Sequence, residues 1–305
     1  MELKPVIKWA GGKRQIIEDI FKLLPNKINI YYEPFLGGGS VFLKLLEKCN
    51  NKNIVVNQFI LNDKNTNLIN LYLSIKNNIN ELLDYLKIIT NNYYNAKDIK
   101  YESRHKCNIE VDMLIDDIID KGKLYVFYFY RNEYNNIKTN KIKKSELFIF
   151  LNKTCFRGLY REAKNKFNVP FGNYKSPFFY NENYLNKLNL LFNKYNILFL
   201  NKNFIDIKYD LSKDNFIYLD PPYYPIKENS FVDYQKSGFR EEENIKLIKL
   251  CDTFNNNKIK FIHSNSYCSY NINNYNKYSI EKILCKRRIN SKNPEDVIYE
   301  ILIFN

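Results

Sequence analysis

The feature that most constrains the fold of this chain is the alternation of short apolar runs with helical segments at both ends of the sequence. Near the N-terminus, an apolar run at 28–35 is followed by a glycine-rich turn, a helical stretch at 40–46 and a second apolar run at 60–62. Further apolar runs follow near the C-terminus at 197–200, 216–219, 259–263 and 297–304. Strands separated by helices are typical of a mostly parallel sheet with helices on both faces. We therefore predict an α/β fold.

A long segment of different composition separates the two groups of apolar runs. Apolar residues at 65–89 recur every three or four positions, which predicts helical structure. Residues 121–180 hold thirteen Lys and Arg against three Asp and Glu, with sixteen Tyr and Phe among them, in a chain of net charge +14. This composition favours contact with a polyanion, although individual residues could simply form a solvated face over an aromatic core. We predict a split α/β domain at 1–72 and 190–305, with a mainly helical insertion at 73–189.

Composition also excludes several classes of protein. With 45% hydrophobic and 16% aromatic residues, the chain can bury a core and is not disordered. Its six cysteines include no C-x-x-C pair and are accompanied by only two histidines, so we expect no metal site. No apolar run is long enough to span a membrane, and the N-terminus lacks a signal-peptide core. We expect no membrane contact and a cytoplasmic location, in the host cell if the protein is viral.

A glycine-rich turn at 33–40 lies between a predicted strand and a predicted helix. Glycines there let the backbone approach a ligand and leave N–H groups facing it. Because Phe42 stands at the last position of the fingerprint G-x-G-x-x-G, a nicotinamide enzyme is disfavoured. Asp63, at the end of the next strand, could accept hydrogen bonds from both hydroxyls of a ribose. Together they suggest a nucleoside site; the alternatives are a tight turn without a ligand and a helix N-cap at Asp63.

The most specific motif is Asp220-Pro221-Pro222-Tyr223, which ends the apolar run at 216–219. Two successive prolines cannot donate hydrogen bonds and hold the backbone extended, which leaves carbonyl oxygens beside the carboxylate. These acceptors suit an amino group, and Tyr223 offers a face on which a planar base can stack. The alternative is a strand-end turn with no function.

Four segments of the chain resemble the D12 class of DNA adenine N6-methyltransferases, the Dam and DpnM type. The segments are 8–13 (KWAGGK), 33–40 (EPFLGGGS), 151–172 (LNKTCFRGLYR to FNVPFG) and 220–223 (DPPY). Their order is that of the family's alpha group. The resemblance implies a Rossmann-like S-adenosylmethionine-dependent methyltransferase sheet, split as above, with an inserted mainly helical target-recognition domain that binds DNA.

The resemblance also implies which residues bind S-adenosylmethionine. They would be Trp9, Ala10, Gly11, Lys13, Pro34, Phe35, Gly37, Gly39, Asp63, Asn203, Phe204 and Asp220. Lys13 could reach the methionine carboxylate of the cofactor, and Asp63 its ribose. For Trp9, the single tryptophan of the chain, the alternative is a buried core aromatic.

The implied reaction is direct transfer of a methyl group to N6 of an adenine flipped out of duplex DNA. Asp220 and Pro221 would accept hydrogen bonds from the amino group and stabilise the positive charge that grows on N6. Pro222 would keep the backbone extended, and Tyr223 would stack on the base.

The DNA-binding residues implied by the resemblance are Lys8, Phe156, Arg157, Leu159, Arg161, Pro170 and Tyr174. Arg161 could bond O6 and N7 of guanine, Leu159 and Pro170 could contact a thymine methyl, and Phe156 could fill the gap left by the flipped base. For Lys8, a contact to the outer guanine, a phosphate contact and simple solvation are alternatives. The family often has Asn where Arg157 stands. The expected target is GATC.

The leading interpretation is therefore a site-specific DNA adenine N6-methyltransferase, with double-stranded DNA and a cognate restriction endonuclease as partners. One alternative is a methyltransferase acting on RNA adenine or on cytosine N4 of DNA, although Asp220 favours adenine. The other is a catalytically inactive DNA-binding protein of the same fold, which the presence of Asp63 and Asp220 disfavours.

Overall fold

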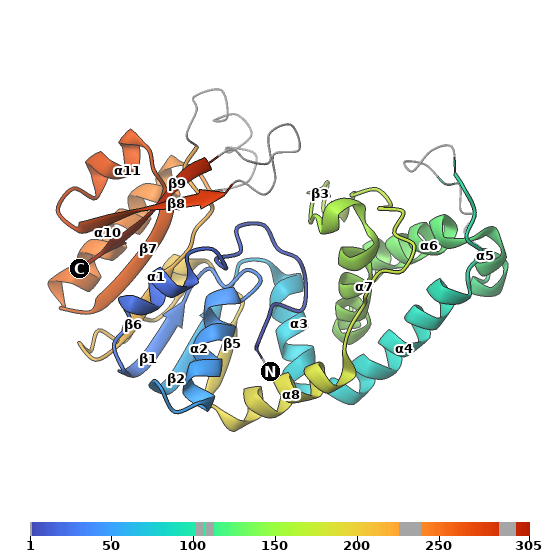
Figure 1. Ribbon diagram of the computed structural model, residues 1–305, viewed down its shortest axis with the longest axis horizontal. Helices are drawn as coiled ribbons and strands as arrows, with labels where there is room; N and C mark the ends of the chain where they lie inside the picture. Colours follow the sequence, from blue (N-terminus) through green and yellow to red (C-terminus); the bar gives the residue numbers. More distant parts are fainter. Residues whose placement is uncertain (1, 102–106, 108–112, 226–238, 287–296) are drawn as a thin grey trace. The chain divides into compact units, whose positions relative to one another are not determined.

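The structure, a computed structural model, describes residues 2–101, 107, 113–225, 239–286 and 297–305. The chain forms two compact units, shown in Figure 1. The sheet unit comprises Met1–Leu3, Lys13–Lys64 and Tyr195–Asn305, and the helical unit comprises Lys4–Gly12 and Asn65–Lys194. No helix in the described ranges is long and apolar enough to cross a membrane.

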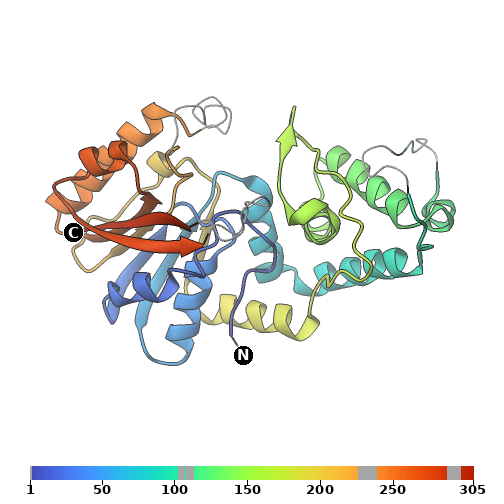
Figure 2. The same cartoon turned by 45° about the horizontal axis from the view of Figure 1, so that its top comes forward.

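The sheet unit contains a seven-stranded sheet in the order β5-β2-β1-β6-β7-β9-β8. The strands are β1 (Lys27–Glu33), β2 (Val55–Asn62), β5 (Ile197–Leu200), β6 (Phe216–Leu219), β7 (Lys260–Ser266), β8 (Ser279–Lys286) and β9 (Val297–Phe304). The first five pair in parallel, whereas β9 is antiparallel to both β7 and β8. Figure 2 shows β8 and β9, in red, at the edge of this sheet. The helices of this unit are α1 (Ile17–Lys22), α2 (Ser40–Asn50), the short η2 (Phe204–Asp206), α10 (Glu241–Asn256) and α11 (Ser269–Asn274).

Helices cover both faces of the sheet. On one face, Phe42 of α2 packs edge-on against Phe59 of β2 and Phe199, at centroid distances of 5.8 and 6.2 Å. On the other face, Phe254 of α10 and Tyr275, which follows α11, belong to one buried cluster with side chains of β1, β6, β7 and β9. The two layers bury large apolar side chains on both sides of the central strands, and β6 is accordingly apolar and buried at every position.

The predicted α/β fold with a mostly parallel, Rossmann-like sheet is confirmed. Some element boundaries differ from the prediction. The strand predicted at 60–62 begins earlier, at Val55. Its first half was not predicted because exposed and buried residues alternate there and form no continuous apolar run. The strand predicted at 259–263 continues to Ser266 through polar residues that are nevertheless buried. The antiparallel edge strand β8 was not predicted, since its charged and apolar residues carry a weaker strand signal.

The helical unit contains six α-helices and a short hairpin among its described residues. They are α3 (Thr66–Asn77), α4 (Ile79–Asn95), α5 (Ile115–Lys121), α6 (Lys123–Asn136), α7 (Lys141–Thr154), the short η1 (Phe156–Gly158), the hairpin strands β3 (Glu162–Ala163) and β4 (Lys166–Phe167), and α8 (Glu182–Lys194). The helical structure predicted over 65–89 is confirmed, and it is divided into α3 and α4. The chain leaves helical geometry at Asn78 (φ −137°, ψ 41°), so two helices with a continuous apolar period meet at a kink.

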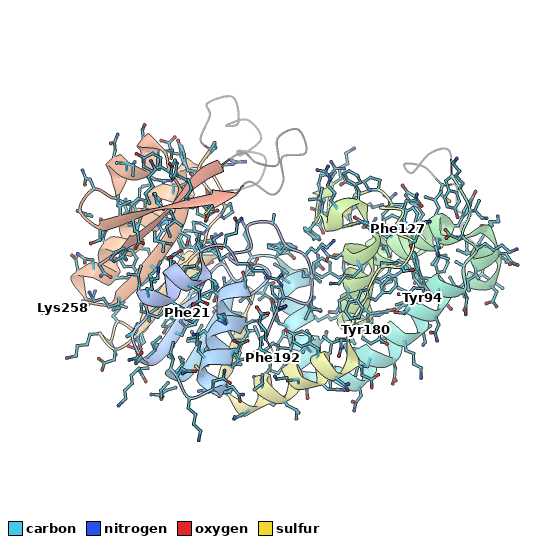
Figure 3. The ribbon with its side chains drawn as sticks, viewed as in Figure 1. Phe21, Tyr94, Phe127, Tyr180, Phe192 and Lys258 are labelled. Carbon is cyan, nitrogen blue, oxygen red and sulfur yellow. The ribbon has the colours of Figure 1, made fainter. Side chains whose placement is uncertain are left out.

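Aromatic side chains fill the interior of the helical unit, where Phe127, labelled in Figure 3, is fully buried. Phe150 of α7 stacks on Phe179 at 5.5 Å, and Tyr93 of α4 meets both rings edge-on. Many residues of the basic aromatic stretch at 121–180 are therefore core residues, as the alternative interpretation of that stretch allowed.

One buried carboxyl group makes the stability of the helical unit depend on pH. Glu146 of α7 is 4% exposed, and its Oε2 has no hydrogen-bond partner among the described residues. Burial raises the pKa of Glu146 from 4.5 to about 9. Between pH 4.5 and pH 9, Glu146 is therefore protonated in the folded protein and ionised in the unfolded chain. The free energy of unfolding decreases as pH rises through this range.

We expect Glu146→Gln to match the wild type in thermal stability at pH 4.5 and to exceed it at pH 8. The gain should be about 1 kcal/mol or more, or roughly 2 °C in Tm, because the variant has no proton to lose. Circular dichroism melting curves at both pH values test this, with the exposed Glu182→Gln as control. Equal slopes of Tm against pH for wild type and Glu146→Gln would contradict it.

Candidate functional site

The order of the strands creates a switch point at β1. This strand pairs with β2 on one side and β6 on the other, and the chain runs outward from it in both directions. In open parallel sheets, ligands bind beyond the carboxyl ends of the strands at such a point. The glycine turn follows β1 there, and Asp220 follows β6. The two strongest motifs of the sequence are thus neighbours in the sheet unit, although they are far apart in the chain.

The glycine turn bends sharply and is tied to the end of β2. Gly37 and Gly39 have φ angles of +51° and +68°, a left-handed conformation that favours glycine. The Gly37 N–H donates to Asp63 Oδ2 at 2.8 Å, and the Leu36 N–H donates to the carbonyl of Asn62. Gly39 itself is the N-cap of α2. The alternative role of Asp63 as a helix N-cap is wrong, because Asn65 caps α3.

Asn62 is a site residue that the sequence did not reveal. Its side chain is 1% exposed, and its amide nitrogen donates to the carbonyls of Pro34 and Lys202 at 2.9 and 3.1 Å. Its amide oxygen accepts the Lys202 N–H at 2.9 Å. One buried asparagine therefore connects the glycine turn with the loop after β5. The asparagine-rich composition of the chain concealed this signal.

The loop after β5 carries Asn203 and Phe204, which were predicted to bind the cofactor. Asn203 caps the short helix η2 by accepting the Ile205 N–H. The ring of Phe204 lies 5.1 Å from that of Phe35 in the glycine turn, and both rings contact Phe239. These three rings form an apolar cluster beside the turn, whose Phe35 stays partly exposed.

An ion pair holds the Asp-Pro-Pro-Tyr segment. Asp220 Oδ1 lies 2.8 Å from Lys13 Nζ, with side-chain exposures of 19% and 3%. The same ammonium lies 4.6 Å from the ring centroid of Tyr223, which is a cation–π distance. The Tyr223 hydroxyl donates to Glu300 Oε2 of β9 at 2.7 Å. Lys13 and Glu300 thus restrain the two ends of this segment; Glu300 was not predicted as a site residue.

Burial raises the pKa of two carboxyl groups at this end of the sheet. Burial raises the pKa of Asp220 to about 6, while the Lys13 ammonium opposes the rise and the Glu300 carboxylate adds to it. Glu33, at the end of β1, is 2% exposed, and burial raises its pKa well above the ordinary range. The Tyr31 hydroxyl donates to Glu33 Oε2 at 2.7 Å. Burial thus disfavours the charged form of both carboxyl groups, and at Asp220 the Lys13 ammonium opposes this effect at ion-pair distance.

Three of the predicted cofactor residues, Trp9, Ala10 and Gly11, belong to the helical unit. Trp9 packs against Tyr160 at 5.1 Å and meets Phe148 edge-on at 6.3 Å. These contacts agree with the alternative of a packed aromatic, although Trp9 is not fully buried. Its contact with a cofactor stays a prediction, as do those of Ala10 and Gly11.

The structure gathers the predicted DNA-binding residues on one part of the helical unit. Phe156 and Leu159 are each 39% exposed. The Phe156 N–H donates to the carbonyl of Pro170 at 2.8 Å, and the Arg157 N–H donates to the Tyr174 hydroxyl at 2.9 Å. The segment at 155–172 is thus closed on itself into a compact loop.

Lys8 is attached to this loop through a buried asparagine. The Asn152 side chain accepts the Lys8 N–H at 2.8 Å and donates to the Lys8 carbonyl at 2.9 Å and to the Gly158 carbonyl at 3.0 Å. Lys153, beside Asn152, was not predicted as a site residue. The pKa of Lys153 is lowered to about 8, mainly by burial and to a smaller extent by the Lys8 ammonium. Lys153 is thus a second cation beside the loop at 155–172, and it is partly buried.

Comparison with known proteins places the chain in a family. The family described as D12 class N6 adenine-specific DNA methyltransferase matches residues 9–289. The chain belongs to this family. Among the residues that the structure describes, no group of three or more His, Cys, Asp or Glu is arranged to hold a metal ion.

Named relatives of this D12 methyltransferase cover almost all of its length. The chain is 34% identical to the type II methyltransferase M.MjaIII of Methanocaldococcus jannaschii, with 100% of both chains covered. It is 30% identical to a DNA adenine methylase of Haemophilus influenzae, over 96% of this chain and 89% of that protein. It is also 28% identical to the type II methyltransferase M1.LlaDCHI of Lactococcus lactis, over 100% of this chain and 96% of that protein. The resemblance inferred from four motifs is confirmed.

The backbone at Arg157 suits the Asn that the resemblance implies at this position. Arg157 has φ +58°, in the left-handed region, where Asn is tolerated better than other residues with a Cβ. We expect Arg157→Asn to stabilise the protein by about 1 kcal/mol, or roughly 2 to 4 °C in Tm. Scanning calorimetry measures the change. Arg157→Ala removes the same charge and keeps the strain, so an equal gain in that control would contradict the explanation.

Proposed function

We propose that the protein transfers a methyl group from S-adenosylmethionine to N6 of a flipped adenine in duplex DNA, within GATC. The observation that carries this proposal is the position of Asp220 at the carboxyl end of β6, beside the glycine turn and paired with Lys13 at 2.8 Å. An ionised carboxylate followed by two prolines offers acceptors to an amino group at the switch point of the sheet.

The residues of the sheet unit suit S-adenosylmethionine. Asp63 supplies a carboxylate for the ribose hydroxyls, at the strand next to the glycine turn. Phe35 and Phe204 supply apolar faces for an adenine ring. The turn needs no diphosphate-binding fingerprint, because this cofactor contains no phosphate. When bound, S-adenosylmethionine supplies an activated methyl group on its sulfonium.

Asp220 would have two effects on the target amino group. As an acceptor, its carboxylate orients the N6 hydrogens and makes the nitrogen lone pair more available. As an anion of low exposure, it stabilises the positive charge that grows on N6 in the transition state, where low polarity strengthens the interaction. Lys13 keeps this carboxylate ionised near neutral pH despite its burial.

Support for a guanine contact comes from the way Arg161 is held. Its Nε donates to Asn168 Oδ1 at 2.8 Å, while the side chain stays exposed. The terminal nitrogens of an arginine held through Nε can face O6 and N7 of one guanine. The exposed Phe156 and Leu159 nearby in the sequence provide apolar contacts for a thymine methyl or an unstacked base step.

Product analysis tests the proposed reaction. Purified protein is incubated with unmethylated duplex DNA and cofactor labelled in its methyl group, and the nucleosides are then separated. We expect label in N6-methyladenine, and sequencing of the DNA should find it in GATC. Label in N4-methylcytosine or only in RNA would support the alternative substrates. A folded protein that gives no label in any nucleoside would support the inactive DNA-binding protein.

The rate should depend on the ionisation of Asp220. We expect kcat/KM, which reports the free enzyme, to level off above pH 7 and to fall about tenfold per pH unit below 6. Lys13→Met removes the cation that lowers the pKa of Asp220, so this acidic limb should move to higher pH. Lys22→Met, which removes a surface pair with Asp19, serves as control. An acidic limb that Lys13→Met leaves in place would contradict this role of Lys13.

Arg161→Ala should relax specificity at one guanine of the target. A lost bidentate contact costs about 1 to 3 kcal/mol of discrimination, or roughly 5- to 150-fold. Relative kcat/KM values on GATC duplexes with single substitutions measure this. The exposed Lys166→Ala, on the same hairpin, should instead weaken binding to all duplexes alike. Uniform weakening by Arg161→Ala would show that Arg161 contacts only phosphate.

A further inference from the structure

The backbone that follows the Asp-Pro-Pro-Tyr segment is held by two buried side chains of β7. Asn265 Oδ1 accepts the Tyr224 N–H at 3.0 Å, and Ser266 Oγ donates to the Tyr224 carbonyl at 2.6 Å. Asn265 is 0% exposed and Ser266 is 3% exposed. The peptide groups on both sides of Tyr224 are therefore bound by neighbouring residues of one strand.

The same strand also binds the beginning of the segment. Leu219, the last residue of β6, pairs with His263 of β7 in the parallel ladder. The segment between Leu219 and Tyr224 is thus attached to β7 at both ends. Pro221 and Pro222 cannot donate hydrogen bonds, so this loop has fewer backbone anchors than an ordinary one. The two bonds at Tyr224 carry a correspondingly larger part of its positioning.

The orientation of the Asn265 amide is determined by its neighbours. Its oxygen also accepts the Ser266 N–H at 2.8 Å, so the nitrogen must face His263 Nε2, 3.1 Å away. An amide nitrogen is only a donor, and Nε2 must then be an acceptor, with the proton of the neutral ring on Nδ1. Burial lowers the pKa of His263 to about 3, which agrees with a neutral ring. His263 thereby prevents a flip of the Asn265 amide.

A third buried residue supports this arrangement from α11. The Asn271 amide nitrogen donates to the Ser266 carbonyl at 2.8 Å, and Asn271 is 0% exposed. The end of β7 is therefore bound from α11 as well as paired with its neighbouring strands. Directed hydrogen bonds thus hold the amides of Asn265 and Asn271, while His263 Nδ1 and Asn271 Oδ1 have no hydrogen-bond partner among the described residues.

We propose that Asn265 and Ser266 are positioning residues, which hold the Asp-Pro-Pro-Tyr segment in the geometry that the target adenine requires. This inference rests on the proposed function, because it assigns these residues to the step at Asp220 and Tyr223. They act through the Tyr224 backbone and not by contact with the adenine. Their loss should therefore lower kcat and the occupancy of the flipped base, with little effect on the KM for the cofactor.

The test compares Asn265→Ala and Ser266→Ala with the wild type. If the whole free energy of one lost buried hydrogen bond is added to the activation barrier, kcat decreases by about 5- to 150-fold. Fluorescence of 2-aminopurine at the target position of a duplex measures base flipping separately from turnover. We expect lower kcat and lower fluorescence in both variants, with the KM for S-adenosylmethionine within about twofold of the wild type. Asn265→Asp should recover most of kcat, because a carboxylate still accepts both N–H groups and His263 can move its proton to Nε2.

The matched control is Asn215→Ala, at the opposite end of β6. Asn215 is also buried, accepts the Ile30 N–H at 3.0 Å and donates to the Asp210 carbonyl at 2.8 Å. We expect it to lower Tm and to leave kcat and the fluorescence unchanged. An equal loss of kcat in Asn215→Ala, or unchanged kcat in a folded Asn265→Ala, would overturn the inference. If Asn265→Ala does not fold, Ser266→Ala, which loses one hydroxyl, decides by the same criteria. An inactive wild type would refute the proposed function instead.

Discussion

Parallel pairing of β1 with β6 is the constraint on which the rest of the sheet unit depends. It brings together residues such as Ile30 and Asn215, which are 185 positions apart, and a parallel pair cannot be closed by a tight turn. The chain must therefore leave the sheet and return, and the helical unit is built from part of that excursion. The pairing also creates the switch point at which the glycine turn and Asp220 lie at neighbouring strand ends.

Low exposure at this point shifts the pKa values of the carboxyl groups. Glu33 and Asp220 lie at strand ends, Lys13 lies in the segment before α1, and burial disfavours the charged form of each carboxyl group. Asp220 is paired with the Lys13 ammonium, which opposes the rise in the pKa of this carboxyl group. The same burial that makes an anion costly also makes its interaction with a growing positive charge strong. In the proposed reaction, this gives Asp220 its effect.

Buried asparagines connect the loops of both units. Asn62 joins the glycine turn to the loop after β5, Asn152 joins Lys8 to the loop at 155–172, and Asn265 binds the backbone at Tyr224. An amide side chain offers donors and an acceptor together, so it can replace the backbone partners that an irregular loop lacks. In a sequence this rich in Asn, composition conceals these positions, and only their burial distinguishes them from surface residues.

The sequence by itself determined the mostly parallel sheet, through its apolar runs and helical periods, and the family, through four motifs in a set order. It also indicated Asp63 and Asp220, because a carboxylate at the end of an apolar strand is a local feature. Only the tertiary structure decided the Lys13–Asp220 pair, the Tyr223–Glu300 hydrogen bond, the break at Asn78 and the roles of the buried asparagines. These depend on burial and on contacts between distant positions, and no local pattern of residues encodes which polar side chains lose their water.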